Sequence, residues 1–283
     1  MENRTPLDNS LVQQPRHSRL SMLVTPQGVH VTVVSQVTDG SLIYRYLPFD
    51  RGADSVVRAF EDAVYDNPLL LADFGQTDVL IDTHRYLVMP AAEATADRAS
   101  AVLSELYPDS AFDVLLSATG QPDGTGANAH PVIAAAVDSQ LMAFIRRTFS
   151  TAAVQHSLAP LCRYFGLKRG LGNSGKLHVH LDGDRTHIIA YGSQGLLMAN
   201  TVHTPTPADV AYYVLAAARH LRFDNANDRL VVSGDTGGRD KLLPILRKHI
   251  SFVMPLIFPS EVFRTGRAAM EAPFQLVIQP LLD

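Results

Sequence analysis

The 283-residue sequence has one cysteine, Cys162, and no long apolar run. A single thiol cannot form an intramolecular disulfide or a cysteine-based zinc site, so nothing in the sequence points to an oxidising compartment. No stretch approaches the roughly 20 apolar residues that a membrane-spanning helix needs. We therefore expect a cytoplasmic protein without direct membrane insertion.

Charge is sparse and unclustered. Charged residues make up 18% of the chain, the net charge is −4, and the lysines and arginines form no stripe. The electrostatic footprint of nucleic-acid binding is therefore missing. Residues 1–18 are polar and lack the apolar core of a signal peptide, which indicates a disordered tail.

The most informative feature is a weak internal repeat between residues 19–81 and 176–232. Each copy opens with a β-rich segment, a short turn and a second β-rich segment, which is the pattern of a hairpin. The two hairpins align at a constant offset of 157 residues (176 − 19), so Leu23 corresponds to His180. A third strand, a helix and a buried strand follow each time. The sequence therefore predicts two β-β-β-α-β units.

Different material separates the two copies. It predicts strands and helices in the order 86–89, 91–106, 112–117, 132–137, 139–147, 154–158 and 159–165, with a flexible glycine-rich loop at 120–126. We predict a first half at 19–172, with a small subdomain inserted at about 85–150. The second half is predicted at 173–283.

This order of elements resembles the actin-like ATPase fold. Residues 132–136 and 154–158 are similar to the segment that precedes the second phosphate loop in the branch containing PilM and FtsA. From about residue 19 onward, including 42–46 and 209–215, the chain resembles domain-of-unknown-function family 3822, a bacterial family with no assigned activity. The resemblance implies an α/β protein with a duplicated actin-like (ribonuclease H-like) fold and a subdomain inserted in the first half.

The resemblance also implies which positions would handle a nucleotide. In active members of the fold, each first hairpin carries an Asp for Mg²⁺ and a Gly for phosphate. Here Leu23 and His180 stand at the Asp positions, and Thr25 and Asp182 stand at the Gly positions. Leucine cannot ligate a metal, neutral imidazole is a poor Mg²⁺ ligand, and a carboxylate repels phosphate. We expect no cofactor and no ATP hydrolysis.

The adenosine-side motif survives in part at residues 231–235, with Asp235 where a second glycine is expected. The vestigial nucleotide cleft is predicted at Leu23, Thr25, Gln27, Gly28, His180, Asp182, Gly183, Asp184, Thr186, Ser233, Gly234 and Asp235. Two functions stay open: a non-catalytic protein-interaction or scaffold module, or a nucleotide-binding protein with divergent phosphate loops and little or no hydrolysis. The paired loss of groups in both turns favours the first.

Two other patterns resemble enzyme motifs. Residues 170–176 have the glycine and lysine spacing of a P-loop, but Leu177 replaces the hydroxyl residue and a strand follows instead of a helix, which indicates a linker. Ser174 and Ser233 are flanked by glycine, but neither has the full nucleophile-elbow pattern. Neither pattern predicts an enzyme.

The histidines could suggest a metal site. His178, His180 and Asp182 alternate along one predicted strand and so share a face. No fourth ligand is near in sequence, so an ordinary sheet surface is the simpler interpretation, and we expect no metal. Cys162 lies among apolar residues and is interpreted as a small core hydrophobe.

The resemblance to PilM and FtsA implies a partner protein or peptide, bound through the first half and its insertion. The predicted helix at 91–106 offers a helical face and the strand at 86–89 a possible sheet edge. These are two recurring ways in which proteins capture peptides. Tyr86 and Tyr107 are the candidate anchors, because aromatic side chains carry much of the energy at such sites. Either could instead be a core residue.

Overall fold

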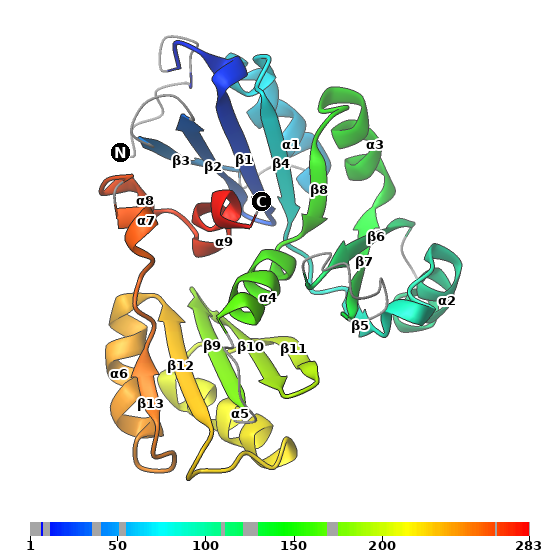
Figure 1. The fold of residues 1–283 in the computed structure, drawn as a ribbon. Helices are drawn as coiled ribbons and strands as arrows, with labels where there is room; N and C mark the ends of the chain where they lie inside the picture. The colour runs from blue at the N-terminus through cyan, green and yellow to red at the C-terminus, as the bar shows by residue number, and fades with distance from the viewer. Residues whose placement is uncertain are drawn as a thin grey trace.

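The computed structural model describes residues 7, 12–35, 41–50, 55–108, 111–120, 130–168, 175–263 and 265–282. Two five-stranded sheets form two lobes, and a smaller three-stranded sheet extends to the side of the first (Figure 1). The predicted loop residues 121–126 and the P-loop-like residues 170–174, with Ser174, lie outside the described residues.

The first sheet has the order β3-β2-β1-β4-β8. The first strand pairs antiparallel with the second and parallel with the fourth. These strands are β1 (Ser18–Thr25), β2 (Gly28–Ser35), β3 (Leu42–Pro48), β4 (Gln76–Ile81) and β8 (Ala153–His156).

The second sheet repeats this arrangement as β11-β10-β9-β12-β13. Its strands are β9 (Lys176–Asp182), β10 (Arg185–Gly192), β11 (Gly195–His203), β12 (Arg229–Gly234) and β13 (Val253–Pro255). Leu23 pairs with His30 in the first hairpin, and His180 pairs with His187 in the second. The offset of 157 (180 − 23 and 187 − 30) therefore holds in space, and the predicted duplication of a β-β-β-α-β unit is confirmed.

Two helices cover the outer face of each sheet. They are α1 (Val56–Tyr65) and α3 (Ser139–Thr148) on the first sheet, and α5 (Pro207–His220) and α6 (Thr236–Leu246) on the second. Alternate residues of each central strand point into these outer cores, as the two-residue strand period requires. Helix α5 is well capped, because Thr206 and Asp209 form a reciprocal capping box.

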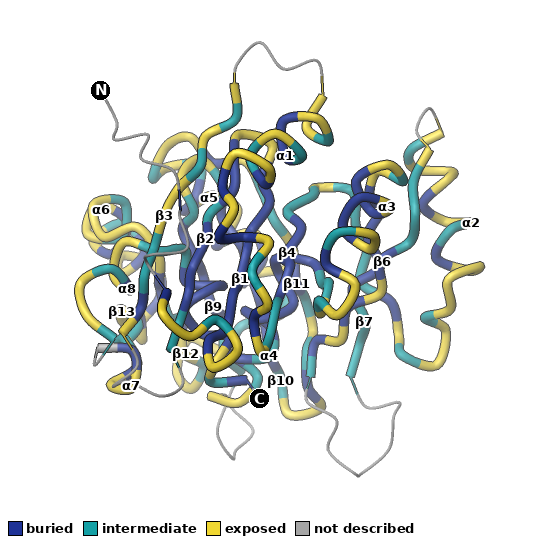
Figure 2. Tube along the Cα trace, turned by 90° about the horizontal axis from the view of Figure 1, so that it is seen from above, coloured by how far each residue is buried: buried dark blue, intermediate teal, exposed yellow. Residues whose placement is uncertain are grey.

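The insertion is a three-stranded antiparallel sheet of order β5-β7-β6 with one helix. It comprises β5 (Tyr86–Met89), α2 (Ala96–Leu106), β6 (Phe112–Ala118) and β7 (Val132–Asp138). The predicted helix from residue 91 begins instead at 96, because Thr95 caps it by accepting a hydrogen bond from the Arg98 N–H. Much of α2 is exposed (Figure 2).

Helix α3, which we placed in the subdomain ending at about 150, contacts β6 and β7 of that subdomain and also packs on helix α1 of the first lobe. Its Phe144 ring contacts Phe60 of α1 edge-on, with ring centroids 5.5 Å apart. The apolar stripe of α3 therefore adds to the core begun by α1. Helix α4 (Leu158–Leu167), placed by sequence in the first half, packs on the second sheet.

The C-terminal segment also departs from the predicted boundary at 173–283. After β13 the chain crosses back to the first lobe as α7 (Ser260–Phe263), α8 (Ala268–Glu271) and α9 (Phe274–Val277) (Figure 1). Its apolar side chains cluster with Leu42 of β3 and with Leu23 of β1. Short 3₁₀ turns complete the fold at Pro15–His17, Pro68–Leu71, Ala91–Glu93 and Gln279–Leu281.

The predicted disordered tail is wrong where the structure describes it. Leu7 is 1% exposed, its N–H donates to Asn67 Oδ1 at 2.9 Å, and its carbonyl accepts from the Leu69 N–H. Val12 is also buried in the first core. None of the described helices combines the length and apolar character needed to cross a bilayer.

Candidate functional site

The two hairpin turns that would hold a nucleotide face each other between the lobes. The first, at residues 25–28, is closed by its own groups. The Thr25 hydroxyl donates to the Gly28 carbonyl at 2.9 Å and accepts from the Gln27 N–H at 3.3 Å. A side chain at Gly28 would place its Cβ 2.5 Å from the Leu47 carbonyl oxygen. Glycine therefore serves close packing on β3.

The first Asp position is apolar in structure as well as in sequence. Leu23 is 2% exposed and clusters with Leu80 of β4 and Leu276 of α9. The C-terminal helix thus covers the side chain that replaces the metal ligand.

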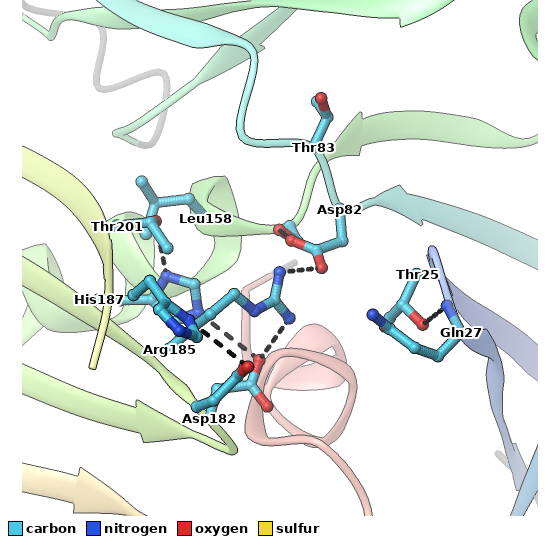
Figure 3. A network of polar contacts seen from close by, with 12 residues as sticks. Thr25, Gln27, Asp82, Thr83, Leu158, Asp182, Arg185, His187 and Thr201 are labelled. Carbon is cyan, nitrogen blue, oxygen red and sulfur yellow. Dashed lines mark hydrogen bonds and ion pairs between the residues drawn. The ribbon is translucent and has the colours of Figure 1, made fainter. Parts of the chain in front are cut away.

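The second turn, at residues 182–185, joins an ion-pair network that crosses between the lobes (Figure 3). The Arg185 guanidinium bonds to the Asp82 carboxylate and lies 3.5 Å from Asp182 Oδ2. Asp82 follows β4 and is held on the first lobe, because its N–H donates to the Val24 carbonyl and Ser157 donates to its carboxylate at 3.2 Å. Arg185 therefore links the two lobes directly.

The network continues along the second sheet to the insertion. His187 Nε2 lies 3.6 Å from Asp182 Oδ2, and its Nδ1 lies 2.8 Å from the Thr201 hydroxyl. Tyr86 donates to the same hydroxyl at 3.0 Å. Burial alone would raise the pKa of Asp182, but the His187 contact and the Arg185 charge outweigh it and hold that pKa below its usual range. Asp182 is thus ionised and already paired with Arg185 and His187.

The second Asp position, His180, is fully enclosed. Its Nδ1 lies 2.9 Å from the Ser233 hydroxyl, and its ring centroid is 5.7 Å from that of Phe274 on α9. Burial, reinforced by the nearby His187, lowers the pKa of His180 to about 3, so the ring is neutral at pH 7. Helix α9 therefore covers both Asp positions.

Gly234 and Asp235 have structural roles. Gly234 has a φ of +91°, and a Cβ there would lie 1.9 Å from the Leu181 carbonyl oxygen, so only glycine fits. The Asp235 carboxylate accepts from the Gly238 N–H at 2.5 Å and caps the N-terminus of α6.

The other predicted residues of the second hairpin are spread around its rim. Gly183 supplies the positive φ of +61° that the turn needs. Asp184 lies 3.5 Å from the exposed His203, while Thr186 is buried against the Thr204 hydroxyl at 2.6 Å. These side chains do not converge on one point.

Sequence reasoning missed the residues that close this region. Asp82 and Arg185 are 103 positions apart, and only their places at the end of a predicted strand and in a predicted turn could have marked them. Nothing in the sequence indicated that Phe274 and Leu276 return to the turns.

Two other candidate residues are associated with α4: Cys162 lies within this helix, and His178 of β9 packs against it. The His178 ring stacks on Phe165 with centroids 4.3 Å apart, and burial lowers its pKa to about 3. Burial raises the pKa of the Cys162 thiol, which keeps it protonated. Across the described ranges no three His, Cys, Asp or Glu side chains gather as a metal site would require.

The two candidate anchors differ in position. Tyr86 packs against His156 with ring centroids 4.6 Å apart, and burial raises its pKa to about 12. It lines an open groove of about 450 Å³ between β5 and β11. Tyr107 is half-buried at the end of α2, where its hydroxyl donates to the His84 carbonyl at 3.4 Å.

Comparison of the chain with known protein families and solved structures supports this fold. Residues 8–253 match the family described as "Protein of unknown function (DUF3822)". No curated protein is significantly similar to the chain. A crystal structure from Bacteroides thetaiotaomicron VPI-5482, titled a protein with actin-like ATPase fold and unknown function, is similar with a TM-score of 0.72 and 18% identity, covering 93% of this chain and 96% of that one.

The PilM–PilN type IV pilus biogenesis complex is also similar, with a TM-score of 0.55 and 11% identity, covering 95% of this chain and all 100% of that one. At these identities the likeness establishes the fold alone. It is the actin-like fold that the sequence predicted.

Proposed function

The chain belongs to the DUF3822 family, and we propose that it is a non-catalytic module that binds another protein on an actin-like scaffold. The observation that carries the proposal is the filling of both nucleotide turns by the protein's own side chains. Leu276 covers Leu23, Phe274 covers His180, and Arg185 ties Asp182 to Asp82.

These residues do not fit a Mg²⁺-nucleotide. Mg²⁺ needs oxygen ligands, which Leu23 and the neutral His180 cannot provide. A phosphate at the second turn would meet the Asp182 carboxylate, whose partner Arg185 is already engaged by two anions. Phosphoryl transfer depends on positioned positive charge around the phosphates, and at the second turn the Arg185 charge is already paired with Asp82 and Asp182.

A protein partner accords with what the same fold does elsewhere. One similar structure is, by its title, a complex of PilM with PilN. In this chain the insertion supplies the surfaces suited to such a role, because β5 is an edge strand and α2 has an exposed outer face. Tyr86 and Tyr107 flank these surfaces and are the proposed anchors.

Photo-crosslinking in cells tests the proposal. A photoreactive amino acid at Leu106 on α2, which is 57% exposed, should capture the same protein reproducibly. The matched control is Tyr212 on α5 of the second half, which is 68% exposed and should not capture it. Recovery of no reproducible partner from position 106, or equal recovery from position 212, would contradict the proposal.

A further inference from the structure

The open groove of about 450 Å³ lies between two sheet edges that face each other across the lobes. One wall is β5, the edge of the insertion, and the other is β11, the edge of the second sheet. The Tyr86–Thr201 hydrogen bond joins these strands and holds their spacing without a ligand. Sheet edges carry rows of backbone donors and acceptors that another strand can complete.

The register shows which backbone groups of β5 point into the groove. The Ala136 N–H donates to the Arg85 carbonyl, which places Arg85 in a hydrogen-bonded pair with β7. Bonded and non-bonded pairs alternate along an antiparallel ladder, so Tyr86 and Val88 direct their N–H and C=O groups away from β7. Within the described ranges no strand pairs with β5 on that side.

The β11 edge is partly protected. The Thr204 N–H donates to the Asp184 carbonyl, so by the same alternation Ala199 and Thr201 point away from β10. The Thr201 N–H is already bonded to Asn200 Oδ1 at 2.9 Å. The β5 edge is therefore the better template for an added strand.

The chemistry of the walls restricts what can bind. The groove is lined by aliphatic residues, two prolines, the Tyr86 ring and the Asn200 amide, without a charged side chain among them. A charged side chain placed here would lose water without gaining an ionic partner, which is costly. The walls are thus electrostatically complementary to an uncharged chain segment.

We propose that this groove binds an extended, uncharged segment of a partner protein, which adds as a strand to the β5 edge. This inference rests on the proposed protein-binding function and gives it a location. The four residues of β5 set the length of pairing at about 13 Å, from about 3.3 Å per residue. Backbone pairing gives affinity, and the uncharged walls select the side chains.

A phage-displayed library of random decapeptides, selected on the full chain, tests the inference. Recovered peptides should carry an uncharged, β-branched run of about four residues. They should bind Val88→Pro about tenfold more weakly, because proline removes the donor that points into the groove but leaves the β7 ladder intact. Val88→Ala keeps that donor and is the matched control, with binding within about twofold.

A second variant tests the groove independently, in case Val88→Pro does not fold. Leu197 is 54% exposed in the groove lining, so Leu197→Glu should keep the wild-type melting temperature and also weaken binding about tenfold. Failure to select peptides, selection of charged peptides, or wild-type binding to Val88→Pro and Leu197→Glu would overturn the groove assignment. Crosslinking from position 106 would still decide the proposed function separately.

Discussion

The two hairpin turns share one backbone register but are closed by opposite chemistry. In the first, Leu23 is sealed in an apolar cluster and Thr25 bonds within its own turn. In the second, Asp182 lies in a charged network and Arg185 reaches across to the other lobe. The duplicated fold thus fixes where the turns lie but leaves their side chains free to differ.

Helix α9 packs against both turns, so removing its buried side chains should have the largest effect on the free energy of unfolding. Phe274→Ala should lower the free energy of unfolding by about 4 kcal/mol, and Leu276→Ala by about 3 kcal/mol, because each leaves a buried cavity. Met270→Ala in the same segment, at a 54% exposed position, should cost less than about 0.5 kcal/mol. Urea unfolding measures all three. Costs below about 1 kcal/mol for the first two would show that α9 does not close the turns.

Removing the ion pair between the lobes should have the second-largest effect on stability. Arg185→Met should cost about 2 kcal/mol, because Asp82 is left 6% exposed with its charge unpaired, although the 29% exposure of Arg185 reduces the effect. Adding Asp82→Asn should recover about 1 kcal/mol in a double-mutant cycle. Arg267→Met, at a 92% exposed surface pair, is the control. Strict additivity of the two changes would contradict the link between lobes.

The sequence predicted what local patterns determine. Turn signals and strand alternation located both hairpins, and the constant spacing between them predicted the matching register of Leu23 and His180. Long-range contacts were not accessible in this way. The C-terminal helices α7, α8 and α9 have four residues each, too few for an amphipathic period to reveal which sheet they cover.

The candidate site was predicted unevenly for the same reason. The loss of metal and phosphate groups was visible at Leu23 and Asp182, because the resemblance to the actin-like fold implies those positions and the repeat matches them between the halves. What replaced them was not visible, since the Asp82–Arg185 pair joins residues 103 positions apart. The burial of Leu7 was missed because a single leucine among polar residues forms no periodic pattern.

The dependence of stability on pH should also distinguish the two turns, although this effect is smaller, because His180 titrates and Leu23 does not. The pKa of His180 is lowered to about 3, so as pH falls below about 6.5 the unfolded state takes up a proton that the folded state does not. Stability is therefore lost on acidification, by about 1.4 kcal/mol between about pH 7 and pH 5.5 for this residue. His178 and His156, with pKa values of about 3 and about 4, act in the same direction.

His180→Leu makes the second turn resemble the first. Its loss of stability over this pH range should be about 1.4 kcal/mol smaller than that of the wild type. Urea unfolding at both pH values gives the difference. An unchanged pH dependence would mean that His180 is protonated in the folded protein, contrary to its burial.

The claim that both turns are filled by the protein's own side chains is tested most directly by thermal unfolding with millimolar Mg²⁺-ATP. We expect an unchanged melting temperature, because Leu23 and His180 offer no metal ligand and Asp182 is bound to Arg185. A nucleotide present at about 100 times its dissociation constant would add about 2.7 kcal/mol of stability. A clear rise in melting temperature with Mg²⁺-ATP would contradict the account.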